Sequence, residues 1–352
     1  MIQQLTKEAI LLLKNLIEQP SFSSEEAETA LLIMDWFADH NIKFERSNHN
    51  IWAKNKFFDT RKPTILLNSH HDTVKPNQAY TRDPFKAEVI DGKLYGLGSN
   101  DAGGCLVSLL ALFTYFYEKE DLKYNLIIVA SAEEESSGPN GLNSVLPLLP
   151  PIDVAIVGEP TQMQLAVAEK GLLVLDCCAY GKAGHAAHGL GENSIYKAME
   201  AVEWFRTFEF PEESETLGKV KMTVTQISAG NQHNVIPAEC RFVVDVRVTD
   251  KYSNQQVLDI VKEHVNVEVK ARSLRLNSSS IPVEHPLVQA GISLGRKTYG
   301  SPTLSDQAVL SCPSLKLGPG DSLRSHTADE FIYVNEIEEG IQLYIDLLSK
   351  IL

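Results

Sequence analysis

The sequence predicts an α/β protein with a mostly parallel sheet, into which a smaller α+β domain is inserted. Short apolar runs typical of buried strands, at 64–68, 124–131 and 154–157, alternate with helical patterns, as in α/β domains with parallel sheets. From about Lys170 the order changes to strand, helix, two strands, helix and strand. That order is typical of the ferredoxin-like arrangement.

The elements of the larger domain follow from local patterns. Leu5, Leu12 and Leu16 recur at helical spacing, and the charged residues between them are not those of a signal peptide. Residues 23–26 form a capping-box pattern that predicts a helix to about His40. The other elements expected here are a strand at 51–58, an apolar helix at 105–117, a helix at 287–297 and a final helix at 336–348.

Period-two alternation at 220–227 and 241–248 predicts strands in the inserted domain. A chain of 352 residues is long enough for two domains. We therefore expect one domain formed by 1–169 and 281–352 and an inserted domain at 170–280. The other elements expected in the insert are strands at 172–179 and 265–276 and helices at 193–208 and 254–264.

Composition limits the partners and the compartment. The net charge is −14, so neither a nucleic acid nor an anionic membrane is an expected partner. No apolar run reaches the roughly 20 residues that span a bilayer. The five cysteines show no C-x-x-C spacing, and together these features favour a reducing cytoplasm.

Acids and histidines gather where the predicted strands end. Side chains on a strand repeat every two residues, so His70 and Asp72 point to the same face. Parallel strands of an open sheet place such residues at a common edge, and mutually repelling carboxylates there need cations. The combination of histidine and carboxylate ligands fits two ions of zinc, cobalt or manganese. The residues in question are His70, Asp72, Asp101, Glu133, Glu134, Glu159 and His326.

Each of these residues, taken alone, has a plainer explanation. A single histidine is more often a hydrogen-bonded structural residue than a ligand, and an acid before a helix is usually a cap. Their number and their common position favour the metal site.

The motifs resemble those of the M20 metallopeptidases, which include acetylornithine deacetylase, succinyl-diaminopimelate desuccinylase, aminoacylases and carboxypeptidase G. The resemblance covers nearly the whole chain, and the motifs follow one another in the family's order. They are His70-x-Asp72, Gly98-Ser99-Asn100-Asp101, Glu133-Glu134, Gly158-Glu159-Pro160 and His326.

The resemblance implies a role for each residue of the site. Asp101 bridges two metals, and Asp72 orients His70. Glu133 is the general base that takes a proton from water. The triplet 133–135 leaves the register ambiguous, and the preceding Ala130-Ser131-Ala132 favours the first two, which leaves Glu135 without a role. The implied ligands are His70 and Glu159 for one metal, and Glu134 and His326 for the other.

The resemblance also implies that the inserted domain is a lid that supports a homodimer. His185, in Gly181-Lys182-Ala183-Gly184-His185, matches a lid histidine that supplies an oxyanion donor, often across subunits. His188 and His233 remain alternatives. Candidates for binding a substrate carboxylate are Asn234, Arg247 and Arg324, since an arginine offers a planar pair of donors. Asn234 and Arg247 could equally well stabilise the strands of the lid.

Within the family, the chain looks most similar to acetylornithine or succinylornithine deacetylases, which release ornithine for arginine biosynthesis. Succinyl-diaminopimelate desuccinylases, acyl-lysine hydrolases and dipeptidases share the same ligands and remain alternatives. The substrate is in each case a small N-acyl amino acid or peptide.

Other classes of protein fit poorly. Gly96-x-Gly98-x-x-Asp101 fails the dinucleotide-binding fingerprint because an acid stands at the third glycine position. The one G-x-S-x-G, at 291–295, lies within the helix expected at 287–297 and not at a strand-to-helix turn, which argues against a serine hydrolase. A non-catalytic binding protein has no support, because every expected ligand and the base are present.

Overall fold

The computed structural model describes residues 2–352, and the chain divides into two compact units. The larger unit comprises Met1–Val167, Ser280–Tyr299 and Ser305–Leu352, of which Met1 lies outside the described residues. The smaller unit comprises Ala168–Ser279 and Gly300–Leu304. The grouping of Gly300–Leu304 with the smaller unit was not predicted.

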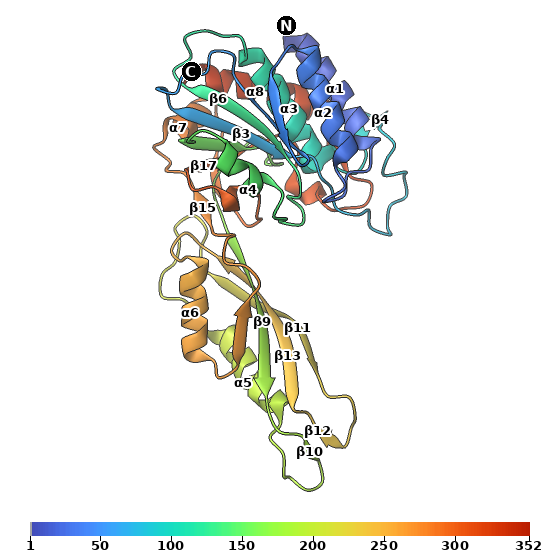
Figure 1. Ribbon diagram of the computed structural model, residues 1–352, viewed down its shortest axis with the longest axis vertical. Coiled ribbons are helices and arrows are strands. Elements are labelled where there is room, and N and C mark those ends of the chain that lie inside the picture. The colour runs from blue at the N-terminus through green and yellow to red at the C-terminus, as the bar shows by residue number, and fades with distance from the viewer. Residues whose placement is uncertain (1) are drawn as a thin grey trace. The chain divides into compact units, whose positions relative to one another are not determined.

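A mixed sheet forms the centre of the larger unit (Figure 1). In the order of hydrogen-bonded neighbours its strands are β1 (Phe44–Ser47), β2 (Asn50–Lys54), β6 (Asn125–Ser131), β3 (Thr64–His70), β7 (Val154–Val157), β17 (Ser314–Lys316) and β8 (Leu165–Glu169), with β15 (Ser279–Ser280) and β16 (Thr298–Ser301) beyond. The central strands β6, β3, β7 and β17 are parallel neighbours. The predicted α/β class with a mostly parallel sheet is thereby confirmed.

Helices cover both faces of this sheet. Ile65 and Leu67 of β3 pack in one apolar cluster with helices, whereas Leu66 between them packs in another with α4 (Leu142–Val145). Alternate strand side chains face opposite sides, so β3 is buried on both faces and only its carboxyl end can carry a site. The helices of the first cluster are α1 (Ile2–Ile17), α2 (Ala27–Asp39), α3 (Gly104–Phe116), α7 (Pro286–Ser293) and α8 (Val334–Ser349).

Short elements complete the larger unit. A separate antiparallel sheet consists of β18 (Phe331–Tyr333), β5 (Lys93–Tyr95) and β4 (Glu88–Ile90). Helical turns are formed by η1 (Ser99–Gly103), η2 (Leu146–Leu148), η3 (Asp306–Val309) and η4 (Ser322–Arg324). Within residues 2–352, no helix combines the length and the apolar character that a membrane span requires.

The smaller unit contains the predicted order of strands and helices. Its antiparallel sheet runs β11 (Lys221–Ala229), β13 (Glu239–Val248), β9 (Gly171–Tyr180) and β14 (Glu268–Ala271), and α5 (Ser194–Thr207) and α6 (Asn254–His264) share its apolar cluster. A small hairpin pairs β10 (Gly184–His185) with β12 (Val235–Ile236). Burial alternates along β13, as the period-two pattern predicted.

Some predicted boundaries were wrong. The strand expected at 51–58 ends at Lys54, and the one expected at 265–276 is only Glu268–Ala271. Both errors have the same cause: a strand extends only as far as its hydrogen-bonded partner, and that partner is distant in sequence. The predicted cap at 23–26 also differs, because Glu26 accepts hydrogen bonds from Ser24 N and Glu133 N instead of capping α2 with its side chain.

Candidate active site

His70 ends β3 with its ring buried and one nitrogen unpaired. Its Nδ1 lies 3.0 Å from the carbonyl oxygen of Asp72, which can only accept, so Nδ1 carries the proton. In the neutral ring the lone pair is then on Nε2, and Nε2 is buried without a hydrogen-bond partner among the described residues. Such a nitrogen is the form in which histidine binds a metal.

Carboxylates from three other segments surround this nitrogen. Nε2 lies 3.4 Å from Asp101 Oδ1, 3.8 Å from Glu159 Oε1 and 4.0 Å from Glu134 Oε2. Asp101 lies in η1 before α3, Glu159 follows β7, and Glu134 follows β6. The sheet thus brings strand-end residues together as its parallel order predicts.

A second group of donors shares Asp101 with the first. His326 Nε2 lies 3.0 Å from Glu135 Oε2 and 3.6 Å from Asp101 Oδ2. The donor atoms of His70, Asp101 and Glu159 lie within 4.8 Å of one another, and so do those of Asp101, Glu135 and His326. A carboxylate shared by two such groups can bridge two cations.

The glutamate triplet does not have the predicted register. Glu135, expected to have no role, faces His326, whereas Glu134, expected to be that ligand, lies near His70. Glu133, expected to be the base, is held elsewhere: its carboxylate accepts from Ser24 Oγ at 2.9 Å and from Asn140 N at 2.9 Å. Glu133 has a positive φ of 54°, so the chain turns there and directs the next two side chains to the metal groups.

Asp72 fixes both His70 and the glutamate loop. Its Oδ1 lies 3.4 Å from His70 Nδ1, and its carboxylate accepts from Glu134 N at 3.0 Å, Glu135 N at 3.1 Å and Ser23 Oγ at 2.7 Å. Asp72 therefore contacts the imidazole on the side away from Nε2 and also holds the backbone of the two glutamates.

The pKa values reflect crowded like charges. Burial, and then the charge of Asp101, raises the pKa of Glu159 to about 8. Burial also raises the pKa of Glu134 well above its usual range. The hydrogen bond with Glu135 is the largest cause that raises the pKa of His326 to about 9. Positive charge is what these carboxylates need in order to stay ionised together.

Two divalent ions fit this set of donors. The unpartnered buried Nε2 of His70 and the carboxylate shared by both groups are difficult to explain otherwise. Nitrogen and oxygen donors with one shared carboxylate are typical of paired zinc, cobalt or manganese sites.

Two further acids support the site, and the sequence analysis did not assign them a role. Glu330 is buried and accepts from Asn100 N at 2.8 Å and Asp101 N at 2.9 Å, so it holds the loop that carries the shared carboxylate. Asp306 is buried and accepts from Ser131 Oγ, at the end of β6, at 2.6 Å. The dipeptide Ser305-Asp306 can be found in the sequence. Its hydrogen bond with Ser131, which is 175 positions away, cannot.

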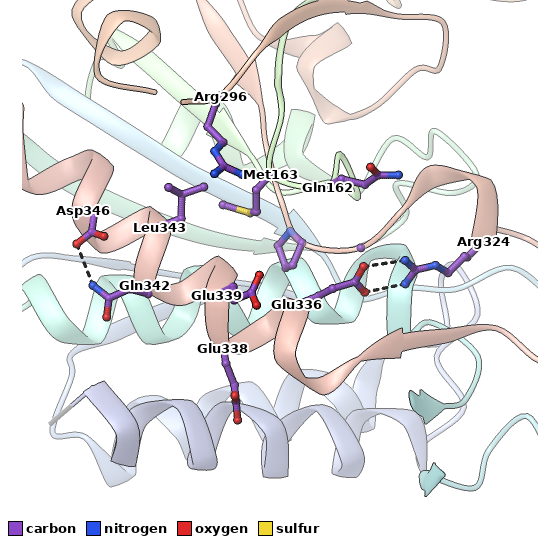
Figure 2. A pocket seen from close by; sticks show the side chains of 12 residues that line it. Gln162, Met163, Arg296, Arg324, Glu336, Glu338, Glu339, Gln342, Leu343 and Asp346 are labelled. Carbon is purple, nitrogen blue, oxygen red and sulfur yellow. Dashed lines mark hydrogen bonds and ion pairs between the residues drawn. The ribbon is translucent and has the colours of Figure 1, made fainter. Parts of the chain in front are cut away.

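Arg324 has a partner that its predicted role did not anticipate. Its NH1 and NH2 donate to the Glu336 carboxylate, both at 2.7 Å (Figure 2), and its guanidinium lies over the Phe331 ring. These contacts give it a structural function near His326 and do not favour substrate binding.

The other predicted substrate-binding residues lie in the smaller unit, each with local partners. Arg247 pairs with Asp245 at 2.9 Å. His185, in β10, accepts from Ala187 N at 3.1 Å, and its ring centroid lies 5.1 Å from that of His188. The main-chain oxygen of Asn234 accepts from Ala186 N at 3.0 Å.

Comparison with known proteins identifies the family. Residues 66–350 match the model of peptidase family M20/M25/M40. The chain is 26% identical to succinyl-diaminopimelate desuccinylase 2 of a Ruegeria species, over 92% of this chain and 90% of that protein. It is 27% identical to acetylornithine deacetylase of Shigella sonnei, over 95% of each.

Solved structures have the same fold. A metallo-carboxypeptidase of the M20 family from Sulfolobus solfataricus superposes with a TM-score of 0.77 at 17% identity, over 98% of this chain and 99% of that one. The Bacillus subtilis YXEP protein, a dinuclear metal-binding peptidase of the M20 family, gives 0.74 at 16% identity, over 98% of each chain. The chain studied here therefore belongs to peptidase family M20/M25/M40 and is a metal-dependent hydrolase of that family.

Proposed function

We propose that the protein removes the N-acyl group from an N-acyl amino acid at a site for two divalent ions, with zinc as the metal. The observation that carries this proposal is the shared Asp101 between two donor groups, one of which contains the unpartnered Nε2 of His70. A single structural ion would need neither the shared carboxylate nor the second group.

The chain's own residues divide the work as follows. His70, Asp101 and Glu159 would hold one ion, and Asp101, Glu135 and His326 would hold the other. When bound, the ions would lower the pKa of a water molecule and polarise the substrate carbonyl.

Glu134 is the residue that fits the role of general base. It is the acid of the triplet that faces the site without belonging to either donor group, and its backbone N–H is held by Asp72. Its carboxylate takes the proton from water and returns it to the leaving nitrogen. Glu133 cannot do so in this arrangement, because Ser24 and Asn140 occupy its oxygens.

The smaller unit supplies the remaining contacts in this proposal. His185 donates to the developing oxyanion, with His188 and His233 as alternatives, and Asn234 and Arg247 bind the substrate carboxylate. In the family that the motifs resemble, the lid histidine often acts across subunits, which supports our proposal of a homodimer that pairs through this unit. The edge strand β11, exposed along much of its length, supports this arrangement.

The substrate proposed is acetylornithine or succinylornithine, cleaved in the cytoplasm to give ornithine for arginine biosynthesis. The similarity to acetylornithine deacetylase of Shigella sonnei supports this choice. The similarity to a succinyl-diaminopimelate desuccinylase keeps that activity, acyl-lysine hydrolysis and dipeptide hydrolysis as alternatives.

A substrate panel on zinc-loaded protein tests the proposal. Acetylornithine, succinylornithine, succinyl-diaminopimelate, acetyl-lysine and simple dipeptides are compared by kcat/KM. Acyl-ornithine should be turned over best, and activity should disappear with a chelator and return with zinc. Turnover of dipeptides alone would reject the deacylase assignment, and activity in chelator would reject the metal site.

A further inference from the structure

A cavity of about 770 Å³ lies in the larger unit, against the outer face of α8 (Figure 2). Its other walls are Gln162 and Met163, which follow Glu159, together with Arg296, and Pro319 and Gly320, which precede His326. None of its lining residues belongs to the two donor groups. Its volume lies in the usual range for small-molecule sites.

Arg296 brings a positive charge to this cavity without a carboxylate partner. The residue is half-buried, and its one side-chain hydrogen bond within residues 2–352 is a weak donation from Nε to Leu294 O at 3.4 Å. Figure 2 shows the guanidinium directed toward Met163 and Leu343. A partly desolvated guanidinium favours a bound anion, and its planar donors suit a carboxylate.

The α8 wall brings the opposite charge. Glu336 is neutralised by Arg324, but Glu339 has only a long contact of 3.5 Å with Asn335 Nδ2, and Asp346 accepts only from neutral Gln342 at 2.9 Å. Three carboxylates of α8, those of Glu338, Glu339 and Asp346, therefore line the cavity with no cation paired to them within residues 2–352. Figure 2 shows Glu338 directed away from the other two. Buried Met163 and half-buried Leu343 supply apolar surface between the charges.

We propose that this cavity binds a small amino acid with a cationic side chain, of the lysine or ornithine class. The carboxylate of the ligand pairs with Arg296, its methylene chain covers Met163 and Leu343, and its ammonium groups face Glu339 and Asp346. Once the Arg324–Glu336 ion pair is set aside, the anionic group and the two cationic groups of the ligand match the guanidinium of Arg296 and the carboxylates of Glu339 and Asp346. The proposal rests on the lining of the cavity and is independent of the reaction assigned above.

The cavity shares its walls with the loops that carry two metal-binding candidates. Met163 N donates to Gly318 O at 2.9 Å, and Gln162 N donates to Gly320 O at 2.7 Å. Asp321 N in turn donates to Asn100 Oδ1 at 3.0 Å, beside Asp101. Because the proposed ligand contacts both loops, we expect its binding to shift Glu159 and His326 relative to Asp101 and so to change turnover.

The test is calorimetric titration of the metal-loaded, full-length protein with L-lysine and L-ornithine. Norleucine, which lacks the second ammonium, and cadaverine and putrescine, which lack the carboxylate, serve as comparison ligands. The variants are Arg296→Gln and, as a matched control, Lys297→Gln, which removes the neighbouring exposed positive charge outside the cavity.

The expected result is saturable binding of the two diamino acids. Their affinity should fall about tenfold or more in Arg296→Gln, because one charged hydrogen-bonded contact is lost, and should be unchanged in Lys297→Gln. A diamino acid that binds at the metal site would bind equally well to both variants, so the variants distinguish that site from the cavity. Equal binding by both variants, or binding of norleucine as tight as that of lysine, would overturn the site.

In a separate assay, turnover of the best substrate is measured at increasing concentrations of the same diamino acids. A change of two-fold or more in kcat or KM, lost in Arg296→Gln, supports the coupling, and unchanged turnover at saturation overturns the coupling. Failure of the proposed reaction would appear separately, as the absence of acyl-amino-acid hydrolysis when no diamino acid is added.

Discussion

His70 Nε2 lies 3.4 Å from Asp101 Oδ1, and no hydrogen-bond donor or acceptor among the described residues satisfies it. An unpaired buried ring nitrogen is costly in a folded protein unless something binds it. The carbonyl of Asp72 holds the proton on the opposite nitrogen. The arrangement of His70 and Asp101 therefore predicts that metal content and stability depend on these two side chains.

Asp101→Asn should lower the metal content from about two ions per chain to one or fewer, because it weakens the carboxylate shared by both donor groups. Elemental analysis after dialysis measures this, and the thermal midpoint should fall with it because metal binding stabilises the fold. Asp121→Asn is the matched control, an exposed aspartate on the same unit. Two ions retained in Asp101→Asn would refute the shared ligand.

The glutamate triplet allows a matched series of isosteric changes. Glu134→Gln should reduce kcat by about 10²- to 10⁴-fold with both metals retained, because the proton acceptor is lost. Glu135→Gln should instead lose one metal, because Glu135 belongs to a donor group.

Glu133→Gln should keep both metals and most activity but lower the free energy of unfolding, because its carboxylate accepts from Ser24 and Asn140. Kinetics, metal analysis and urea unfolding are measured on all three variants. A loss of kcat in Glu133→Gln with metals bound, together with a metal loss in Glu134→Gln, would restore the register that the sequence suggested.

Two glycines with nearly the same φ test the fit of the Asp101 loop. Gly92 has φ +77° with open space for a Cβ, whereas a Cβ on Gly98, with φ +76°, would lie 2.5 Å from Thr73 Cγ2. Gly92→Ala should cost about 1 kcal/mol of unfolding free energy for the left-handed conformation. Gly98→Ala should cost a further 1–3 kcal/mol or so, because Thr73 must move, and should also weaken metal binding. Equal losses would show that the loop adjusts freely.

Asp329 should make stability depend on pH. Hydrogen bonds from Thr81, and then from Arg82 N, lower the pKa of this carboxyl. A lowered folded-state pKa gives stability that is present above the unfolded value of about 3.9 and is lost as the pH falls through the folded value.

Asp329→Asn should therefore be less stable than the wild type at neutral pH, with a difference that narrows below about pH 4. Urea unfolding of both proteins across this range measures it. A difference that stays constant with pH would show that the ionised form has no special role.

Local patterns in the chain predicted the α/β class, the order of elements in the insert and most of the metal-binding candidates. These follow from periodicity along the chain and from acids and histidines placed at the ends of apolar runs. His70 and Glu159 each follow an apolar run, Asp101 follows a glycine-rich loop at a helix start, and His326 precedes an apolar strand. The structure places them in the two donor groups that share Asp101.

The tertiary structure alone decided which glutamate of the triplet faces which partner. Three identical side chains in succession carry no periodic signal, and their directions depend on the turn at Glu133, which is stabilised by Ser24 and Asn140. The partners of the two arginines were also decided by folding. Arg324 pairs with Glu336, whereas Arg296 has no carboxylate partner within residues 2–352. A charged side chain takes its role from the partner that folding places beside it, and that partner lies too far along the chain for local pattern to reveal.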